Sequence, residues 1–264
     1  MTNVSIHGAA GRMGKRLIDL VMNDDQVTLV GAIESSDHPN QGQDAGVIAG
    51  LPPISVSVTN DLPPGKQVVI DFSRAEAVVG ITKQCVEAGL PLVIATTGFS
   101  QSTTAEIQAA SQKIPIVWAP NMSLAVNLTM KLSEIAAAAL HDCGDRVDVE
   151  ITETHHRFKA DAPSGTALKF GELISGKMGI QNQRHGRQGV TGERAPDEIG
   201  YHAIRAGDDP GQHTILFGMM GEKIELRVAA SNRDCYALGA IAAAKFLSDK
   251  SAGMYNMYDV LGFN

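Results

Sequence analysis

The chain has 264 residues, of which 44% are hydrophobic and 19% are charged, as in a folded globular protein with one or two cores. Its net charge of −7 argues against non-specific binding of nucleic acid or of an anionic membrane surface. No apolar run reaches the length that spans a bilayer and no signal-peptide pattern opens the chain, so we expect no membrane association.

The cysteines are few and lie far apart in the sequence. Cys85, Cys143 and Cys235 form no C-x-x-C pair. Such spacing fits neither a disulfide framework nor a zinc knuckle, and it predicts a protein of the reducing cytoplasm.

The N-terminal segment has the order strand, glycine turn, helix. Val4 to His7 is apolar enough for a short strand, and Gly8 to Gly14 follows it with the spacing G-x-x-G-x-x-G. A second predicted strand, Val27 to Ile33, ends at Glu34. In dinucleotide-binding folds the glycines allow a tight turn, the helix start meets the pyrophosphate, and an acid about twenty residues on binds the adenosine ribose. We therefore predict dinucleotide binding here.

Strands and helices then alternate. Three further apolar strands are predicted at Gln67 to Phe72, Pro91 to Ala95 and Ile114 to Ala119. This repetition predicts a Rossmann-like, doubly wound parallel sheet whose ligands lie at the carboxyl ends of its strands. The residues at those ends, which we expect to line a crevice, are Asp71-Phe72, Thr96-Thr97 and Asn121-Met122.

From Arg146 onward strands follow strands. The predicted strands after the first are 198–206, 212–219 and 223–230, which indicate an α+β unit with a mainly antiparallel sheet. Residues 178–197 are rich in glycine, glutamine and arginine and are interpreted as a mobile loop. We predict a dinucleotide-binding domain at 1–127, a substrate-binding and oligomerisation domain at 128–235, and a C-terminal segment, 236–264, that returns to the first domain.

A polar cluster lies where the first strand of the second domain leads into a helix. His155, His156 and Lys159 place three proton carriers in one short connection, and histidine titrates near neutral pH. Ser164 or Thr166 can cap the following helix, whose first amides attract an anion. The cluster therefore predicts a receptacle for a carboxylate or phosphate beside acid–base groups.

The residues just described carry a family resemblance over nearly the whole chain. The pattern E-x-x-E-x-H-H-x-x-K-x-D-A-P-S-G-T-A, complete from Glu150 to Ala167, resembles the signature of the 4-hydroxy-tetrahydrodipicolinate reductase (dihydrodipicolinate reductase) family of bacterial lysine and diaminopimelate synthesis. G-x-x-G-R-M-G at Gly8 and T-T-G-F at Thr96 are further matches.

The resemblance implies a role for each matching residue. His155 and Lys159 are the acid–base pair, and His156, Gly165 and Thr166 bind the substrate's carboxylates. The expected cofactor-binding residues are Gly8, Ala9, Ala10, Gly11, Arg12, Met13, Glu34, Ala95, Thr96, Thr97, Ala119, Pro120, Asn121 and Met122. The resemblance also implies a homotetramer that associates through the sheet of the second domain, and no metal.

Cofactor choice is where the sequence departs from the family. Many relatives have arginine after the ribose-binding acid, where it meets the 2′-phosphate of NADPH, but here the residue is Ser35. Glu34 would repel that phosphate, although Arg12, Lys15 and Arg16 lie near in sequence. We expect NADH to be preferred and NADPH to be tolerated.

The implied reaction is hydride transfer to a cyclic imine dicarboxylate, which requires a proton donor. Lys159 is the first choice for that donor and His155 the second, while Arg184 or Arg205 is a candidate for a carboxylate. One alternative is a metal-assisted hydrolase that uses His155, His156 and Asp161, although adjacent histidines diverge and no H-x₃-H helix pair is present. Another is a non-catalytic protein that senses nicotinamide nucleotides, for which no DNA-binding module is visible.

Overall fold

The structure, a computed structural model, describes residues 1–142 and 147–263. The chain divides into two compact units. Unit 1 comprises Met1–Leu124 and Asp234–Asn264, and unit 2 comprises Ala125–Arg233. The roles predicted for the two domains stay predictions.

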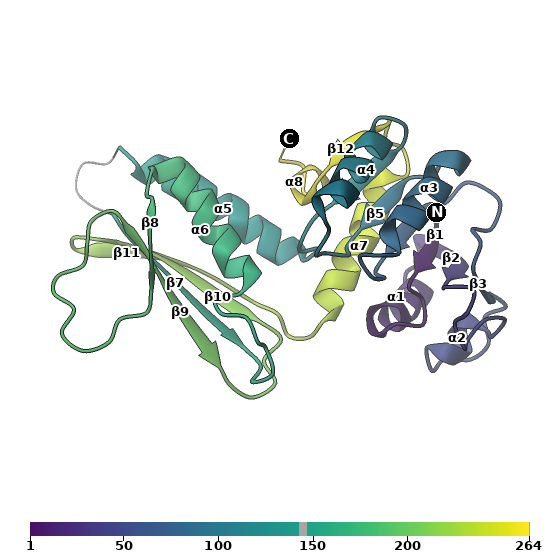
Figure 1. The fold of residues 1–264 in the computed structure, drawn as a ribbon, viewed down its shortest axis with the longest axis horizontal. Helices are drawn as coiled ribbons and strands as arrows, with labels where there is room; N and C mark the ends of the chain where they lie inside the picture. The colour runs from purple at the N-terminus through teal and green to yellow at the C-terminus, as the bar shows by residue number, and fades with distance from the viewer. Residues whose placement is uncertain (143–146, 264) are drawn as a thin grey trace. The chain divides into compact units, whose positions relative to one another are not determined.

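Unit 1, which is coloured purple to teal and, in its C-terminal part, yellow in Figure 1, is built on a seven-stranded sheet. The strand order is β12-β6-β5-β4-β1-β2-β3. Every pairing between neighbouring strands is parallel, which confirms the predicted parallel sheet. Its strands are β1 (Thr2–His7), β2 (Val27–Ile33), β3 (Val58–Thr59), β4 (Val68–Asp71), β5 (Leu92–Ile94), β6 (Pro115–Trp118) and β12 (Gly253–Tyr255).

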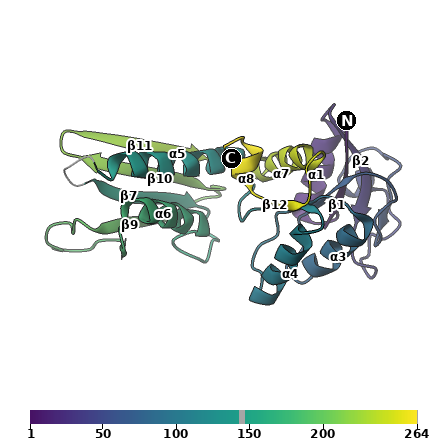
Figure 2. The same ribbon diagram turned by 90° about the horizontal axis from the view of Figure 1, so that it is seen from above.

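Helices cover both faces of this sheet. Neighbouring side chains of a buried strand point to opposite faces, so each strand contributes to two cores. Val68 and Ile70 belong to the core beneath α1 and α7, whereas Val69 belongs to a separate core with α3 and α4. Figure 2 shows the two helix pairs on opposite sides of the strands. The helices are α1 (Arg12–Met22), α2 (Ala45–Ile48), α3 (Val78–Ala88), α4 (Gln101–Ser111), α7 (Asp234–Leu247) and α8 (Met257–Val260).

The C-terminal segment completes the sheet of unit 1. Strand β12 pairs in parallel with β6, and α7 lies against α1. Gly239 in α7 allows a close approach, because a Cβ there would lie 1.8 Å from the backbone oxygen of Met122. Helix α7 therefore packs directly against the segment that follows β6.

Unit 2 has a five-stranded sheet in the order β11-β10-β7-β9-β8. Helices α5 (Leu124–Leu140) and α6 (Gly165–Met178) lie side by side over one face of it (Figures 1 and 2). The strands are β7 (Asp148–His155), β8 (Asn182–His185), β9 (Glu198–Arg205), β10 (Gln212–Met219) and β11 (Glu222–Ala229). Arg146, where the first of these strands was predicted to start, and Cys143 lie outside the described residues.

The predicted second α+β unit is confirmed, and its sheet contains parallel as well as antiparallel pairings. β10 pairs antiparallel with β7 and β11, but β7 and β8 both pair in parallel with β9. The reason is that α6 carries the chain back across the sheet, and such a crossover joins parallel strands. The sheet is therefore mixed.

The segment 178–197, predicted as a mobile loop, contains strand β8 and is held by ion pairs. Arg187 donates to both Glu150 and Glu198, and Arg194 donates to Glu150. Burial alone would raise the pKa of Glu150, but hydrogen bonds from Arg187, His202 and Arg194 lower it to about 2. Charge pairing thus orders a segment whose composition resembles that of a loop.

Alternation along β7 places two ionisable side chains in the core of unit 2. The buried positions of this strand are Val149, Ile151, Glu153 and His155.

No helix among residues 1–142 and 147–263 is long and apolar enough to cross a membrane.

Candidate active site

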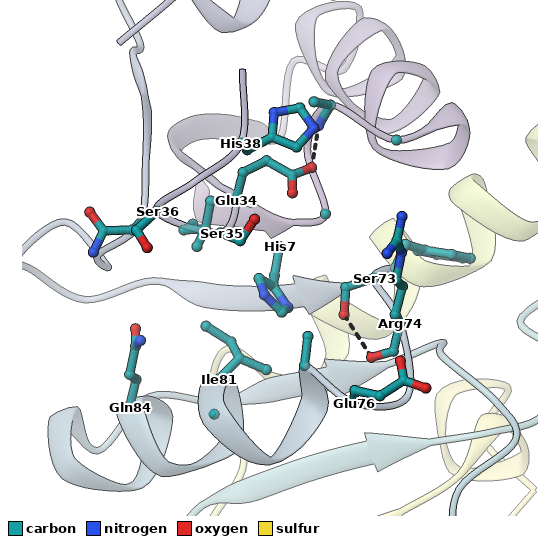
Figure 3. Close-up of a pocket in the computed structure, with 18 residues that line it drawn as sticks. His7, Glu34, Ser35, Ser36, His38, Ser73, Arg74, Glu76, Ile81 and Gln84 are labelled. Atoms are coloured by element: carbon teal, nitrogen blue, oxygen red, sulfur yellow. Dashed lines mark hydrogen bonds between the residues drawn. The ribbon is translucent and has the colours of Figure 1, made fainter. Parts of the chain in front are cut away.

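A cavity of about 800 Å³ opens in unit 1 at the carboxyl ends of β1, β2 and β4 (Figure 3). Four of the predicted cofactor residues line it, namely Gly8, Ala10, Gly11 and Glu34. This is the edge where parallel α/β sheets bind their ligands, and the volume suits a large organic molecule.

The glycine turn has the close backbone approaches that exclude side chains. Gly8 has φ +82°, and a Cβ there would lie 2.7 Å from the backbone oxygen of Phe72. Gly11 is the N-cap of α1 and makes no side-chain cap, so the first amides of the helix remain available to an anion. Glu34 Oε1 accepts a hydrogen bond from Ala10 N–H at 2.8 Å. These residues fit a dinucleotide, with the pyrophosphate at the helix start and a ribose at Glu34.

The remaining predicted cofactor residues of unit 1 do not line this cavity among the residues that the structure describes. Ala9 is fully buried, and Met13 packs against the same core. Arg12, the first residue of α1, is exposed. The others follow β5 and β6, and comprise Ala95, Thr96, Thr97, Ala119, Pro120, Asn121 and Met122. Thr96 is 7% exposed and its Oγ1 is buried without a hydrogen-bond partner among the described residues.

The sequence reasoning missed a hydrogen-bonded histidine in the cavity wall. His7, the last residue of β1, lines the cavity, and its Nδ1 lies 2.7 Å from Oδ1 of the fully buried Asp71. Ser73 donates to the same oxygen. Arg74 also lines the cavity and was not predicted. His7 is the last residue of β1, and Arg74 follows β4 closely. Ligand-binding residues of a parallel sheet lie at the carboxyl ends of its strands, so the positions of His7 and Arg74 in the sequence could have identified them.

In unit 2 the connection from β7 to α6 holds the predicted acid–base residues. Ser164 caps α6, because its Oγ accepts from Ala167 N–H at 3.1 Å, and this settles the choice of cap. Gly165 and Thr166 form the first turn. His156 is half-buried and its Nδ1 has no hydrogen-bond partner among the described residues. Lys159 donates to Asp161 at 2.8 Å.

Behind this connection lies a buried polar network that the sequence did not predict. Glu153 is 1% exposed and accepts hydrogen bonds from two nitrogens of Arg205, at 2.8 and 2.7 Å. It also accepts from Ser164 N–H at 3.1 Å, and it lies 2.5 Å from Nδ1 of His155. Burial alone would raise the pKa of Glu153, but the bonds from Arg205 and His155 lower it below its ordinary value.

A second buried histidine completes the network. His213 lies on β10 directly across from Glu153 on β7. Its Nε2 is hydrogen-bonded to Ser164 Oγ, at 3.0 Å. Its ring stands edge-on to that of His155, with centroids 5.2 Å apart. Burial, and then repulsion from His155, lower the pKa of His213 to about 4. At neutral pH His213 is therefore uncharged.

The arrangement gives the hydrolase alternative no support. Residues 1–142 and 147–263 contain no group of three or more His, Cys, Asp or Glu side chains placed to hold a metal ion. Nδ1 of His155 is already bonded to Glu153. What the connection offers instead is a proton-carrying imidazole, an ammonium group and a helix start, which together suit an anionic substrate that must be protonated.

Two family models together match nearly the whole chain. The family model described as dihydrodipicolinate reductase, N-terminus, matches residues 2–122, and the one described as dihydrodipicolinate reductase, C-terminus, matches residues 125–261.

Individual relatives are similar over their full lengths. A 4-hydroxy-tetrahydrodipicolinate reductase of Rhodopirellula baltica is 55% identical, covering 99% of this chain and 96% of the relative. One from Burkholderia ambifaria is 46% identical, covering 98% of each. Among solved structures, a dipicolinate-bound dihydrodipicolinate reductase from Paenisporosarcina sp. TG-14 has a TM-score of 0.74 and 25% identity, covering 98% of both chains.

Proposed function

The chain belongs to the dihydrodipicolinate reductase family, and we propose that it reduces 4-hydroxy-tetrahydrodipicolinate to tetrahydrodipicolinate with a reduced nicotinamide nucleotide, in the diaminopimelate and lysine pathway. The observation that carries this function is the 55% identity to a reductase of that name over 99% of the chain. The complete family motif from Glu150 to Ala167 agrees with this function.

The cofactor is assigned to unit 1. Gly8, Ala10 and Gly11 with the start of α1 would hold the pyrophosphate, and Glu34 the adenosine ribose, as the cavity and the uncapped helix start support. When bound, the reduced nicotinamide supplies a hydride. We assign Ala95–Thr97 and Ala119–Met122, which follow β5 and β6, to the nicotinamide half.

The substrate is assigned to unit 2. The first turn of α6, at Gly165 and Thr166, would bind one carboxylate. His156 would offer its Nδ1, which has no hydrogen-bond partner within the described part of the chain. Lys159 and His155 hold the protons that the reduced ring nitrogen requires. Arg205 is a poor candidate for a substrate carboxylate, because its guanidinium is already bonded to Glu153 and to Asp161 O.

We infer a preference for NADH with NADPH tolerated. Glu34, Ser35, Ser36 and His38 line the cavity at the end of β2, and a carboxylate repels a 2′-phosphate. Arg16, one of the cations near in sequence, is held by Asp19 and Asp234.

Replacement of Ser35 by arginine is expected to lower KM for NADPH by about tenfold, because one charge-assisted hydrogen bond to the phosphate is worth about 1.5–3 kcal/mol. Steady-state assays with each nucleotide check this, with Ser55→Arg, outside the cavity, as the control. An unchanged NADPH-to-NADH ratio would place the phosphate elsewhere.

We propose a cytoplasmic homotetramer. Its support within unit 2 is that α5 and α6 cover the same face of the sheet (Figure 2), so the opposite face lacks a helical cover from the described part of this unit. Sedimentation of the purified protein gives its mass in solution.

The function is tested by following NADH and NADPH absorbance separately while the product of the preceding condensing enzyme is supplied. Oxidation that persists in EDTA is expected. Consumption of the substrate that needs no nucleotide and is abolished by the chelator would favour the metal-assisted hydrolase. Stoichiometric NADH binding without consumption would favour a sensing protein.

A further inference from the structure

Glu153 occupies a position where a carboxylate is costly. It lies on the core face of β7 between Ile151 and His155, 1% exposed, and an unpaired charge there would be strongly disfavoured. Arg205 offsets that cost with two hydrogen bonds from β9, and Ser164 N–H adds a third. Four hydrogen bonds from three residues on one buried side chain, one of these residues being the predicted acid–base histidine, indicate a role beyond packing.

The partners of Glu153 fix its protonation state and, through it, the tautomer of His155. Arginine and a backbone amide only donate hydrogen bonds, so Glu153 accepts from them as an ionised carboxylate. His155 Nδ1, 2.5 Å from Oε2, must therefore carry a proton. Among residues 1–142 and 147–263, the side-chain hydrogen bond of His155 uses Nδ1 and leaves Nε2, the other ring nitrogen, unbonded. It is the atom left to hold the transferable proton.

The surroundings hold the ring in that orientation. Gly211 lies beside Nε2, where a Cβ would be 2.9 Å away, so the backbone passes close to the ring. His213 packs edge-on from β10 and is uncharged at neutral pH. The titratable groups that contact the His155 ring are Glu153 on β7 and His213 on β10. Arg205 on β9 binds Glu153, and Lys159 and Asp209 on the two connections act on His213.

We propose that Glu153, held by Arg205, is the positioning residue of the reduction: it keeps His155 in the Nδ1–H tautomer and stabilises the imidazolium that donates the proton from Nε2. This inference rests on the proposed reductase function. Loss of the 4-hydroxyl group as water gives the conjugated imine, to which hydride adds, and the proton then passes from Nε2 to the carbon–nitrogen anion so formed. His155 becomes neutral while retaining Nδ1–H, and solvent water restores its proton.

Glu153→Gln is the variant that tests the proposal, because it removes the charge with little change of shape. We expect kcat to fall on the order of 10²-fold. The pH profile of kcat/KM should differ from that of the wild type, because the ring assigned to proton donation has lost its charged hydrogen-bond partner. NADH affinity, measured by fluorescence, should be unchanged, and Glu153→Asp should restore part of the profile.

Glu150→Gln is the matched control. Glu150 lies on the same strand and also binds arginines, but it faces the opposite side and contacts His202 rather than His155. This variant should keep the wild-type pH profile.

A double-variant cycle separates positioning from a merely structural role. In a His155→Gln background, Glu153→Gln should lower kcat less than about threefold further, because a residue that acts through His155 has nothing left to act on. Nitrogen NMR of His155 should show Nδ1–H in the wild type and its loss in Glu153→Gln. If wild type is active but Glu153→Gln retains its pH profile and tautomer, or if the two losses multiply in full, the positioning role is wrong and the reductase function stands. If wild type oxidises no NADH, the reductase function itself fails.

Discussion

Replacement of Lys159 by alanine is expected to lower turnover by about 10²–10⁴-fold while NADH affinity remains unchanged. Lys159 lies in the connection from β7 to α6 of unit 2, whereas the cavity assigned to the nucleotide belongs to unit 1. Its ammonium donates to Asp161, whose carboxylate is exposed, so the pair can exchange for a substrate carboxylate or nitrogen. Single-turnover oxidation of NADH measures the loss directly.

Lys169→Ala is the control for that variant. Lys169 also donates to an acid, Glu172, at 2.8 Å, but it does so from α6 beyond the first turn. Its turnover should match the wild type. Wild-type turnover in Lys159→Ala would remove Lys159 from the chemistry.

Replacement of Gly14 by alanine is expected to destabilise unit 1 by about 1–3 kcal/mol and to raise Kd for NADH at least about tenfold. A Cβ at this position would lie 2.1 Å from Gly8 O and 2.6 Å from both Cα and O of Ala9. All three atoms are backbone, so the glycine turn must move away from α1. That turn is the part of unit 1 assigned to the pyrophosphate.

Gly176→Ala serves as the comparison, because it adds the same methyl group to a helix where no atom lies within 4 Å. It should leave NADH affinity unchanged and the thermal midpoint unchanged or slightly higher. Fluorescence titration and thermal unfolding check both variants. Tight NADH binding by Gly14→Ala would mean that the nucleotide does not lie on the turn.

Local patterns predicted unit 1 well because its signals are local. The run Val4 to His7, the glycines after it and Glu34 all lie within one βαβ unit, where sequence spacing nearly determines spatial position. The order of the seven strands, by contrast, depends on which faces the helices cover. The place of β12 beside β6 depends on a close backbone contact of Gly239, which no periodicity reveals.

Unit 2 was harder to predict because the residues that form its most informative contacts are far apart in the sequence. Glu150 and Arg187 are 37 positions apart, and only their pairing shows that 178–197 is ordered. Glu153 and Arg205 are 52 apart. The alternation that predicted β7 was sound, yet it did not show that a carboxylate would point into the core, because alternation is usually judged by apolar residues.

The most direct test of the central claim is an experimental structure of the protein with NADH and pyridine-2,6-dicarboxylate (dipicolinate). We predict the pyrophosphate at Gly8 to Gly11, and the dicarboxylate against the first turn of α6. Lys159 Nζ or His155 Nε2 should lie within about 2.6–3.2 Å of its polar atoms. A dicarboxylate bound away from both side chains, or a nucleotide away from the glycine turn, would contradict the account.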